Sequence, residues 1–408
     1  MLRRTLLSIA AATFALSLPA SSQSATNGKP EAELYIDVAT HSMPGMPELG
    51  GIGRAAMGLF GGGGGSNSYG MTRFPAMPGQ YLDVALRNTL NPGGDAVDQV
   101  PAGLRLKQLP LLAPKPDKAS RGSGEIGIAD GQVPDSTTRI LIYWGCGTQV
   151  RKGQPKVIEI STKGGKVAVS GSMEGRYVPD RGVDTGPDTA LWPNQKDRRN
   201  VPDGASLAGE HVLSGDRVPE SLKFSLGEGQ DFMPKIQLGS TGDLVAGQTW
   251  RWPAVTGARG YFLHAMGSRN KELVLWSSSE TADAGMGVVD YLPTATVDKW
   301  IGEKVLLPAS ATSCAVPGGI FAGTDGEAAG GMLRMIAYGK ESHIAWPPKP
   351  ADPKAAWDPE WNVRVRTKST AMAMLGMDLS GAARGEGAEE AEEPAKPVKS
   401  LLRGLLGH

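Results

Sequence analysis

The sequence predicts an all-β protein made of two β-sandwich-like domains with long Gly/Pro-rich loops. The 56 glycines and 30 prolines make up about a fifth of the 408 residues, and beyond the N-terminal segment the longest stretch without either is Ser268–Ala284. An interior Gly costs a helix about 1 kcal/mol and an interior Pro about 3 kcal/mol, so long helices are disfavoured. The segments between these breaks are short and apolar, and many of them alternate, which favours strands joined by turns.

The N-terminus has the pattern of a secretory signal peptide, which we expect to comprise residues 1–24. Arg3 and Arg4 precede an apolar run over Leu6–Leu18, and small residues follow over Ala20–Ser24. The run is shorter than the about 20 residues that a membrane span needs, so we expect cleavage and no transmembrane anchor afterwards. A periplasmic or secreted protein is therefore predicted, and Arg3-Arg4 leaves both the general and the twin-arginine export routes open.

The first β domain is predicted over residues 25–170. Glu33–Thr40 and Gln80–Leu86 alternate as strands do, and they share the similar strings YIDVA and YLDVA. Between them, residues 41–78 are rich in Gly and Met, and we expect a flexible insert there. The remaining strands of this domain are expected at Leu104–Leu112, Gly124–Ala129, Arg139–Gly145, Lys156–Ser161 and Lys166–Ser170. Arg139–Trp144 is the most apolar segment, which predicts a central strand buried on both faces.

Residues 171–208 are rich in Pro, Asp, Asn and Gly and are expected to form a linker. A second β domain follows over residues 209–368. Its predicted strands are Ser221–Leu226, Lys235–Leu238, Thr249–Trp252, Gly260–Ala265, Glu272–Ser277, Gly287–Leu292, Met332–Tyr338 and Trp361–Thr367. Residues 381–408 carry the acidic block Glu386–Glu393 and then basic residues, which predicts a disordered charged tail.

One segment of the second domain resembles a known family. GQTWRWPAV over Gly247–Val255, followed by GARGY over Gly257–Tyr261, is similar to the B–C strand hairpin of fibronectin type III-like domains. The resemblance implies that Trp250 or Trp252 is buried near Tyr261 in a β-sandwich core. It implies nothing about chemistry.

Cys146 and Cys314 are the two cysteines of the chain. An oxidising compartment allows one disulfide between them, and two separate buried thiols are the alternative. The two residues lie in different predicted domains.

Motifs of well-known catalytic or cofactor sites are absent. The 42 basic and 42 acidic residues balance, which argues against a nucleic-acid partner. The sequence has no HExxH, GxSxG, P-loop or CxxC pattern, so no catalytic residue, cofactor or metal ligand is assigned. His264 is expected to be a wall residue of a strand, whereas His211 beside Glu210 and His343 near Glu341 would need a spatial partner.

Three functions of different classes remain open. We expect a non-catalytic exported protein that binds or scaffolds another protein or a cell-envelope component through its loops. The second interpretation is a periplasmic copper-binding protein, because thioether and imidazole groups bind Cu(I) and the insert carries His41, Met43 and Met46. The third is a hydrolase whose site is assembled from distant loops.

Overall fold

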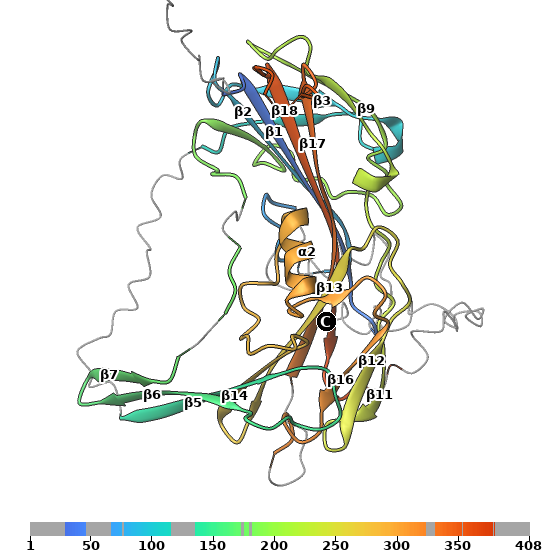
Figure 1. Cartoon of the computed structure of the whole chain (residues 1–408). Coiled ribbons are helices and arrows are strands. Elements are labelled where there is room, and N and C mark those ends of the chain that lie inside the picture. The colour runs from blue at the N-terminus through green and yellow to red at the C-terminus, as the bar shows by residue number, and fades with distance from the viewer. Residues whose placement is uncertain are drawn as a thin grey trace, which may run out of the picture.

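The computed structural model describes residues 29–45, 67–75, 77–115, 135–172, 175–178, 182–323, 331–352, 354–377 and 379. Strands dominate these residues, so the predicted all-β class is confirmed (Figure 1). The one α-helix in the described part is α2 (Thr294–Gly302), accompanied by the short 3-10 turns η1 (Ala102–Leu104) and η2 (Glu228–Gln230). No helix of the described residues has the length and apolarity needed to cross a membrane.

A sheet of eleven strands forms the frame of the molecule. Its strands run in the order β7 (Lys166–Ser170), β6 (Lys156–Lys163), β5 (Ser136–Trp144), β14 (Glu272–Ser277), β13 (Gly260–Arg269), β17 (Gly331–Trp346), β18 (Trp361–Met374), β1 (Ala32–Ser42), β2 (Gly79–Asn88) and β8 (Thr189–Trp192), with β15 (Leu307–Pro308) paired to β13. The pairs β1–β18 and β5–β14 are parallel, and the other pairs are antiparallel.

Two smaller sheets pack on this frame. One has the order β10 (Lys223–Leu226), β9 (Gly209–Gly215), β3 (Ala96–Gln99) and β4 (Leu109–Leu111), and the other has the order β11 (Gly239–Asp243), β12 (Gly247–Arg251) and β16 (Ser313–Pro317). Figure 1 shows them near opposite ends of the long strands β17 and β18. The molecule therefore has two sandwich-like layers that share the central strands of one sheet.

Strand periodicity explains the two cores. On β18, Val363 and Val365 pack with β1, β2 and the four-stranded sheet, which we call the first core. Further along the same face, Ala371 and Ala373 pack with Trp250 and the three-stranded sheet, the second core. Alternate residues of one strand share a face, so one face of β18 serves both cores.

The predicted domain boundary falls inside the large sheet. β1, β2 and β5–β7 come from residues 25–170, whereas β13, β14, β17 and the first part of β18 come from residues 209–368. β8 lies within the predicted linker 171–208, pairs with β2 and is buried at all four positions. The two predicted segments thus share one sheet.

Several strand predictions were wrong in detail. Of Leu104–Leu112 only β4 is a strand, and Lys235–Leu238 and Gly287–Leu292 are not strands. Their apolar side chains are nevertheless buried, as at Ile236 and Val288, because irregular segments also pack on the cores. The predicted strand Gly124–Ala129 lies outside the described residues.

β5 is only partly buried. Leu141, Ile142 and Tyr143 are buried, but Ser136–Arg139 is exposed, so the prediction of a strand buried on both faces holds for its second half alone. Figure 1 shows why: β5, β6 and β7 extend away from the layers that cover the rest of the sheet.

The segment that resembles fibronectin type III-like domains lies in the second core, but it does not form the expected hairpin, because β12 pairs with β11 and β16 and not with β13. Trp250, Trp252 and Tyr261 are all buried. The rings of Trp252 and Tyr261 meet edge to face with centroids 5.6 Å apart, and the backbone N–H of Val255 donates to the Tyr261 hydroxyl at 3.0 Å. β12 and β13 lie in different sheets, so this contact joins the two layers.

Candidate functional site

The face of the central strands opposite the two cores carries polar side chains that are buried. On β18 the residues that alternate with Val363 and Val365 are Arg364, Arg366 and Lys368, and all three are buried. Buried cations require paired carboxylates or π faces, because their desolvation cost is large. Carboxylate and π partners come from β1 and from the irregular segment 283–293.

Arg366 pairs with Asp37 of β1 in a two-bond arrangement. Its Nε and Nη2 donate to the two carboxylate oxygens of Asp37 at 2.7 and 2.5 Å. Tyr291 lies against this pair, with its ring centroid 4.7 Å from the Arg366 guanidinium and 4.1 Å from Lys368 Nζ. Such cation–π contacts stabilise cations most when water is excluded.

Lys368 donates from Nζ to Asp290 Oδ1 at 3.1 Å. The pKa of Lys368 is lowered to about 8, because the lowering by burial and by nearby Arg334 together exceeds the opposing effect of the Asp290 carboxylate. Burial alone would raise the pKa of Asp290, but Lys368 and Arg73 together hold it below the ordinary value. The pKa of Lys368 therefore lies close to neutral pH, well below the ordinary value for a lysine.

Asp83 of β2 is a buried carboxyl group whose partners all lie in segment 67–75. Oδ2 accepts from the backbone N–H of Gly70 at 3.0 Å and of Thr72 at 3.3 Å, and also from the Thr72 hydroxyl. Oδ1 has no partner among the described residues. Burial raises the pKa of Asp83 to about 7 against these hydrogen bonds, and the nearby Asp37 adds to the rise.

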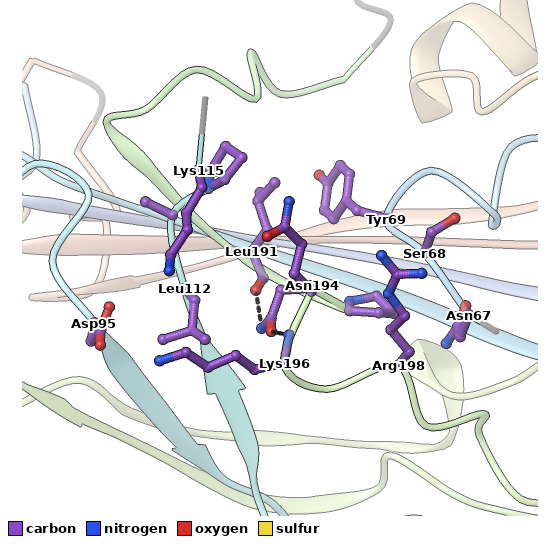
Figure 2. A pocket seen from close by; sticks show the side chains of 14 residues that line it. Asn67, Ser68, Tyr69, Asp95, Leu112, Lys115, Leu191, Asn194, Lys196 and Arg198 are labelled. Atoms are coloured by element: carbon purple, nitrogen blue, oxygen red, sulfur yellow. Dashed lines mark hydrogen bonds between the residues drawn. The ribbon is translucent and has the colours of Figure 1, made fainter. Parts of the chain in front are cut away.

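Segment 67–75 connects this polar face to a pocket. Gly70 and Thr72 bind Asp83, while Asn67 and Tyr69 line a pocket of about 280 Å³ (Figure 2). The other walls are the end of the β4 region, residues 112–115, and the loop 193–198 that follows β8. Tyr69 is near both the pocket and the buried charges. It lines the pocket, and its hydroxyl pKa is raised by burial and then by Asp37 and Asp83.

The loop after β8 is held firmly by two side chains. Asn194 donates to the carbonyls of Pro110 at 2.7 Å and Leu191 at 2.9 Å, and accepts from the N–H of Lys196 at 3.0 Å. Asp197 accepts from the Trp192 indole N–H at 2.9 Å and pairs with Arg199. Because Asn194 and Asp197 already form hydrogen bonds within the protein, they hold the loop in place. Ligand contacts would then come from other lining residues of the loop, such as Lys196 and Arg198.

Positive charge prevails around the pocket. Its lining contains Lys115, Lys196 and Arg198 against the single carboxylate of Asp95. Figure 2 shows the Lys115 and Lys196 side chains extending toward the side where Asp95 lies, while Arg198 is at the opposite side near Asn67. The wall between them is largely apolar, formed by Leu112, Leu191 and the Tyr69 ring among others. An amphipathic anion fits this arrangement.

A smaller pocket of about 130 Å³ lies at the other end of segment 67–75. Arg73, Phe74, Asp290 and Tyr291 line it together with Met286. Arg73 Nη1 lies 3.4 Å from Asp290 Oδ2, so the charges at this opening are paired within the protein.

The predicted copper ligands are only partly described. His41 is the penultimate residue of β1 and is buried, with Nδ1 2.8 Å from the Thr370 hydroxyl. Burial, Arg334 and Lys368 together lower its pKa to about 4. Met43 follows the end of β1, and Met46 lies outside the described residues. Within the described part, no group of three or more His, Cys, Asp or Glu side chains is placed to hold a metal ion.

The histidines considered for a hydrolase do not meet in a pocket. His211 Nδ1 lies 3.1 Å from Asp98 Oδ2 and Nε2 lies 3.0 Å from the Leu207 carbonyl, so both ring nitrogens of this buried residue face protein groups. His264 Nε2 contacts the Ala284 carbonyl at 3.1 Å, and the exposed His343 lies 3.1 Å from Glu341. Neither of the two pockets described above is lined by a histidine.

Cys146 and Cys314 form a disulfide in the structure. The bond joins the connection after β5 to β16, and so ties the large sheet to the three-stranded sheet.

Comparisons with known proteins add no relative. No protein-family model matches the chain, and neither curated proteins nor solved structures give a match. The candidate site is therefore inferred from its geometry alone. Sequence reasoning missed Asp37, Asp83 and Arg366, although the paired strings YIDVA and YLDVA contained the signal, because they place the two aspartates at equivalent positions of neighbouring strands.

Proposed function

We propose that the chain is an exported, non-catalytic binding protein whose pocket at Asn67, Leu112 and Lys196 holds an amphipathic organic anion. The observation that carries this proposal is the excess of three cations over one carboxylate around a largely apolar wall. Anions bind such sites through charge and hydrogen bonds, while the apolar wall contributes through burial of the ligand body.

The rigidity of the pocket supports binding. Trp192 is fully buried, and Asn194 and Asp197 fix the loop that carries Lys196 and Arg198. A pocket that is already formed spends little free energy on ordering when a ligand enters. The absence of histidine from its lining favours binding over hydrolysis for this pocket.

A pair of fluorescent probes tests the proposal. 8-Anilinonaphthalene-1-sulfonate carries a sulfonate on an apolar ring system, and N-phenyl-1-naphthylamine is the corresponding neutral compound. We expect the anionic probe to bind the folded protein with one saturable site and to bind more tightly than the neutral one. Equal affinities, or binding without saturation, would contradict an anion site.

Charge variants locate the binding. Lys115→Gln and Lys196→Gln should each weaken binding of the anionic probe by up to about fivefold, as expected when one exposed ion pair of about 0.2–1 kcal/mol is lost. Lys223→Gln on the exposed side of β10 removes the same charge far from the pocket lining and serves as the control. An equal loss in the control would show that the probe responds to overall charge.

Export is tested on the native protein. The proposal expects the mature chain to begin at Gln23 or Ala25 and to occur in the periplasm or the medium. Mass spectrometry of the N-terminal peptide from the native host measures this directly, and an intact segment 1–22 on the accumulated protein would contradict it.

A further inference from the structure

Among the described residues, nothing pairs with the β7 edge of the large sheet. β7 (Lys166–Ser170) is the last strand of the sheet, and all five of its residues are exposed. Val167 and Val169 are 67% and 62% exposed. β7 contains no proline, and its one charge is at its first residue. The edge strands of natural sheets usually carry prolines, charges or bulges that prevent pairing with another strand. β7 has neither a proline nor a bulge.

The hairpin register shows which backbone groups face outward. Gly164 and Gly165, both with positive φ, form a two-residue turn that makes Lys163 and Lys166 the closing pair of β6 and β7. The closing pair of such a turn is hydrogen-bonded, and hydrogen-bonded pairs alternate along an antiparallel ladder. Lys166, Ala168 and Ser170 therefore direct their backbone groups to β6, and Val167 and Val169 direct theirs to the free edge.

β7 is also self-complementary. Its sequence, KVAVS, has the palindrome Val-Ala-Val at its centre. If two copies pair antiparallel about Ala168, Val167 of each lies opposite Val169 of the other, and the outward N–H and C=O groups of these residues meet as hydrogen-bonded pairs. The register that satisfies the backbone is thus the one that places valine opposite valine.

Charge and apolar surface agree with the same register. Across β6 and β7, Glu159 lies opposite Ser170, and Ser170 would lie opposite Lys166 of the second copy, which leaves no like charges directly opposed. On the other face, Val169 lies opposite Ile160, and the neighbouring pair Ile158 and Ile140 continues an apolar row toward β14. Two copies would join these rows into one continuous surface.

We propose that β7 is a homodimer interface, in which two copies pair antiparallel about Ala168 and the two large sheets become one. The contact is isologous, so it closes as a dimer and does not propagate. The proposal does not depend on the pocket, because none of the pocket residues lies on β5, β6 or β7.

Cysteine substitution tests the register. The Ala168 residues of the two copies would form a non-hydrogen-bonded pair with Cα atoms about 4.5 Å apart, which permits a disulfide. Ala168→Cys should give covalent dimer under mild oxidation, measured on a non-reducing gel. Val169→Cys on the same strand is the matched control, since its copies would be about 7–8 Å apart in diagonal positions, and should give about tenfold less.

A proline variant tests the pairing itself. Val169→Pro removes an N–H that points away from β6, so the hairpin keeps its own bonds while the intermolecular ones are lost. Sedimentation velocity should show dimer for the unmodified protein and monomer for Val169→Pro, with unchanged circular dichroism.

The contrary outcomes are distinct. Monomer at all concentrations with no crosslinking of Ala168→Cys would overturn the proposal. It would be the outcome expected if another strand, such as the predicted strand Gly124–Ala129 of the same chain, occupied this edge. Equal crosslinking of Ala168→Cys and Val169→Cys would overturn the register, since it would indicate random collision of exposed thiols.

Discussion

Asp37 and Asp83 lie directly opposite each other across the antiparallel strands β1 and β2. Two neighbouring carboxylates repel each other when both are charged. The two residues have different hydrogen-bond partners, which reduces this cost. Arg366 neutralises Asp37 by two hydrogen bonds, whereas Asp83 receives only neutral donors from Gly70 and Thr72. The polar face of the sheet thus contains Asp37, which is paired with a cation, and Asp83, whose pKa is raised to about 7.

The first prediction concerns the pH dependence of stability. Between about pH 4 and pH 7 the folded protein keeps the proton of Asp83 that the unfolded chain has released, because its folded pKa is raised to about 7. The contribution of Asp83 to the free energy of unfolding therefore falls as pH rises through this window, by up to about 4 kcal/mol.

Asp83→Asn isolates that contribution. The amide oxygen can accept from Gly70 and Thr72 as Oδ2 does, and the side chain cannot ionise. We expect the variant to match the native protein near pH 4 and to exceed it in stability above pH 7, measured by urea unfolding at both pH values. A constant difference at both would show that Asp83 does not titrate in this range.

The second prediction concerns the buried pair of Asp37 and Arg366. Asp37→Leu leaves the Arg366 guanidinium buried without its carboxylate and should cost about 3–5 kcal/mol. The double variant Asp37→Leu/Arg366→Leu removes both charges and should be more stable than Asp37→Leu alone. Additive losses in the double variant would mean that the two residues do not depend on each other.

The third prediction concerns the disulfide. Cys146 and Cys314 are separated by 168 residues, so the bond restricts a long loop of the unfolded chain. Replacing both by Ala should lower the free energy of unfolding by about 2–5 kcal/mol. Native protein treated with a reductant should show the same loss, and a reductant should have no effect on the double Ala variant.

The fourth prediction uses the half-buried strand β5. Leu141 is buried in the second core, so Leu141→Asp places an unpaired charge in an apolar site and should prevent folding. Thr137→Asp on the exposed half of the same strand is the control and should change stability by less than about 0.5 kcal/mol. Circular dichroism and solubility separate the two outcomes.

The sequence predicted the strands whose alternation is regular and left the other features unresolved. β1, β2 and β18 were found because their apolar residues recur at every second position, and β13 and β14 because each has a short apolar run next to turn residues. β8 was missed because Thr189–Trp192 has only four residues and lies in a Pro- and Asp-rich segment. Such a composition predicts a loop. Nothing local indicates that Trp192 is fully buried.

The polar face shows a different limit. Arg364, Arg366 and Lys368 alternate with valines as solvent-facing residues of a half-exposed strand would. They are buried because residues 67–75 and 283–293 fold over them, and such coverage depends on contacts far apart in the chain. The pocket was missed for the same reason, since its walls come from four separate parts of the chain.

Because β17 and β18 contribute to both cores, neither layer can melt without removing a wall of the other. Ile344 and Val363 lie in or against the first core, while Met335 and Ala371 lie in the second. Heat should therefore unfold the protein in one calorimetric transition, despite a size at which independent domains are common. An anion held at residues 193–198 beside the first core would then raise the melting temperature of the second core as well, so thermal shift of the whole chain reports occupancy of a distant pocket.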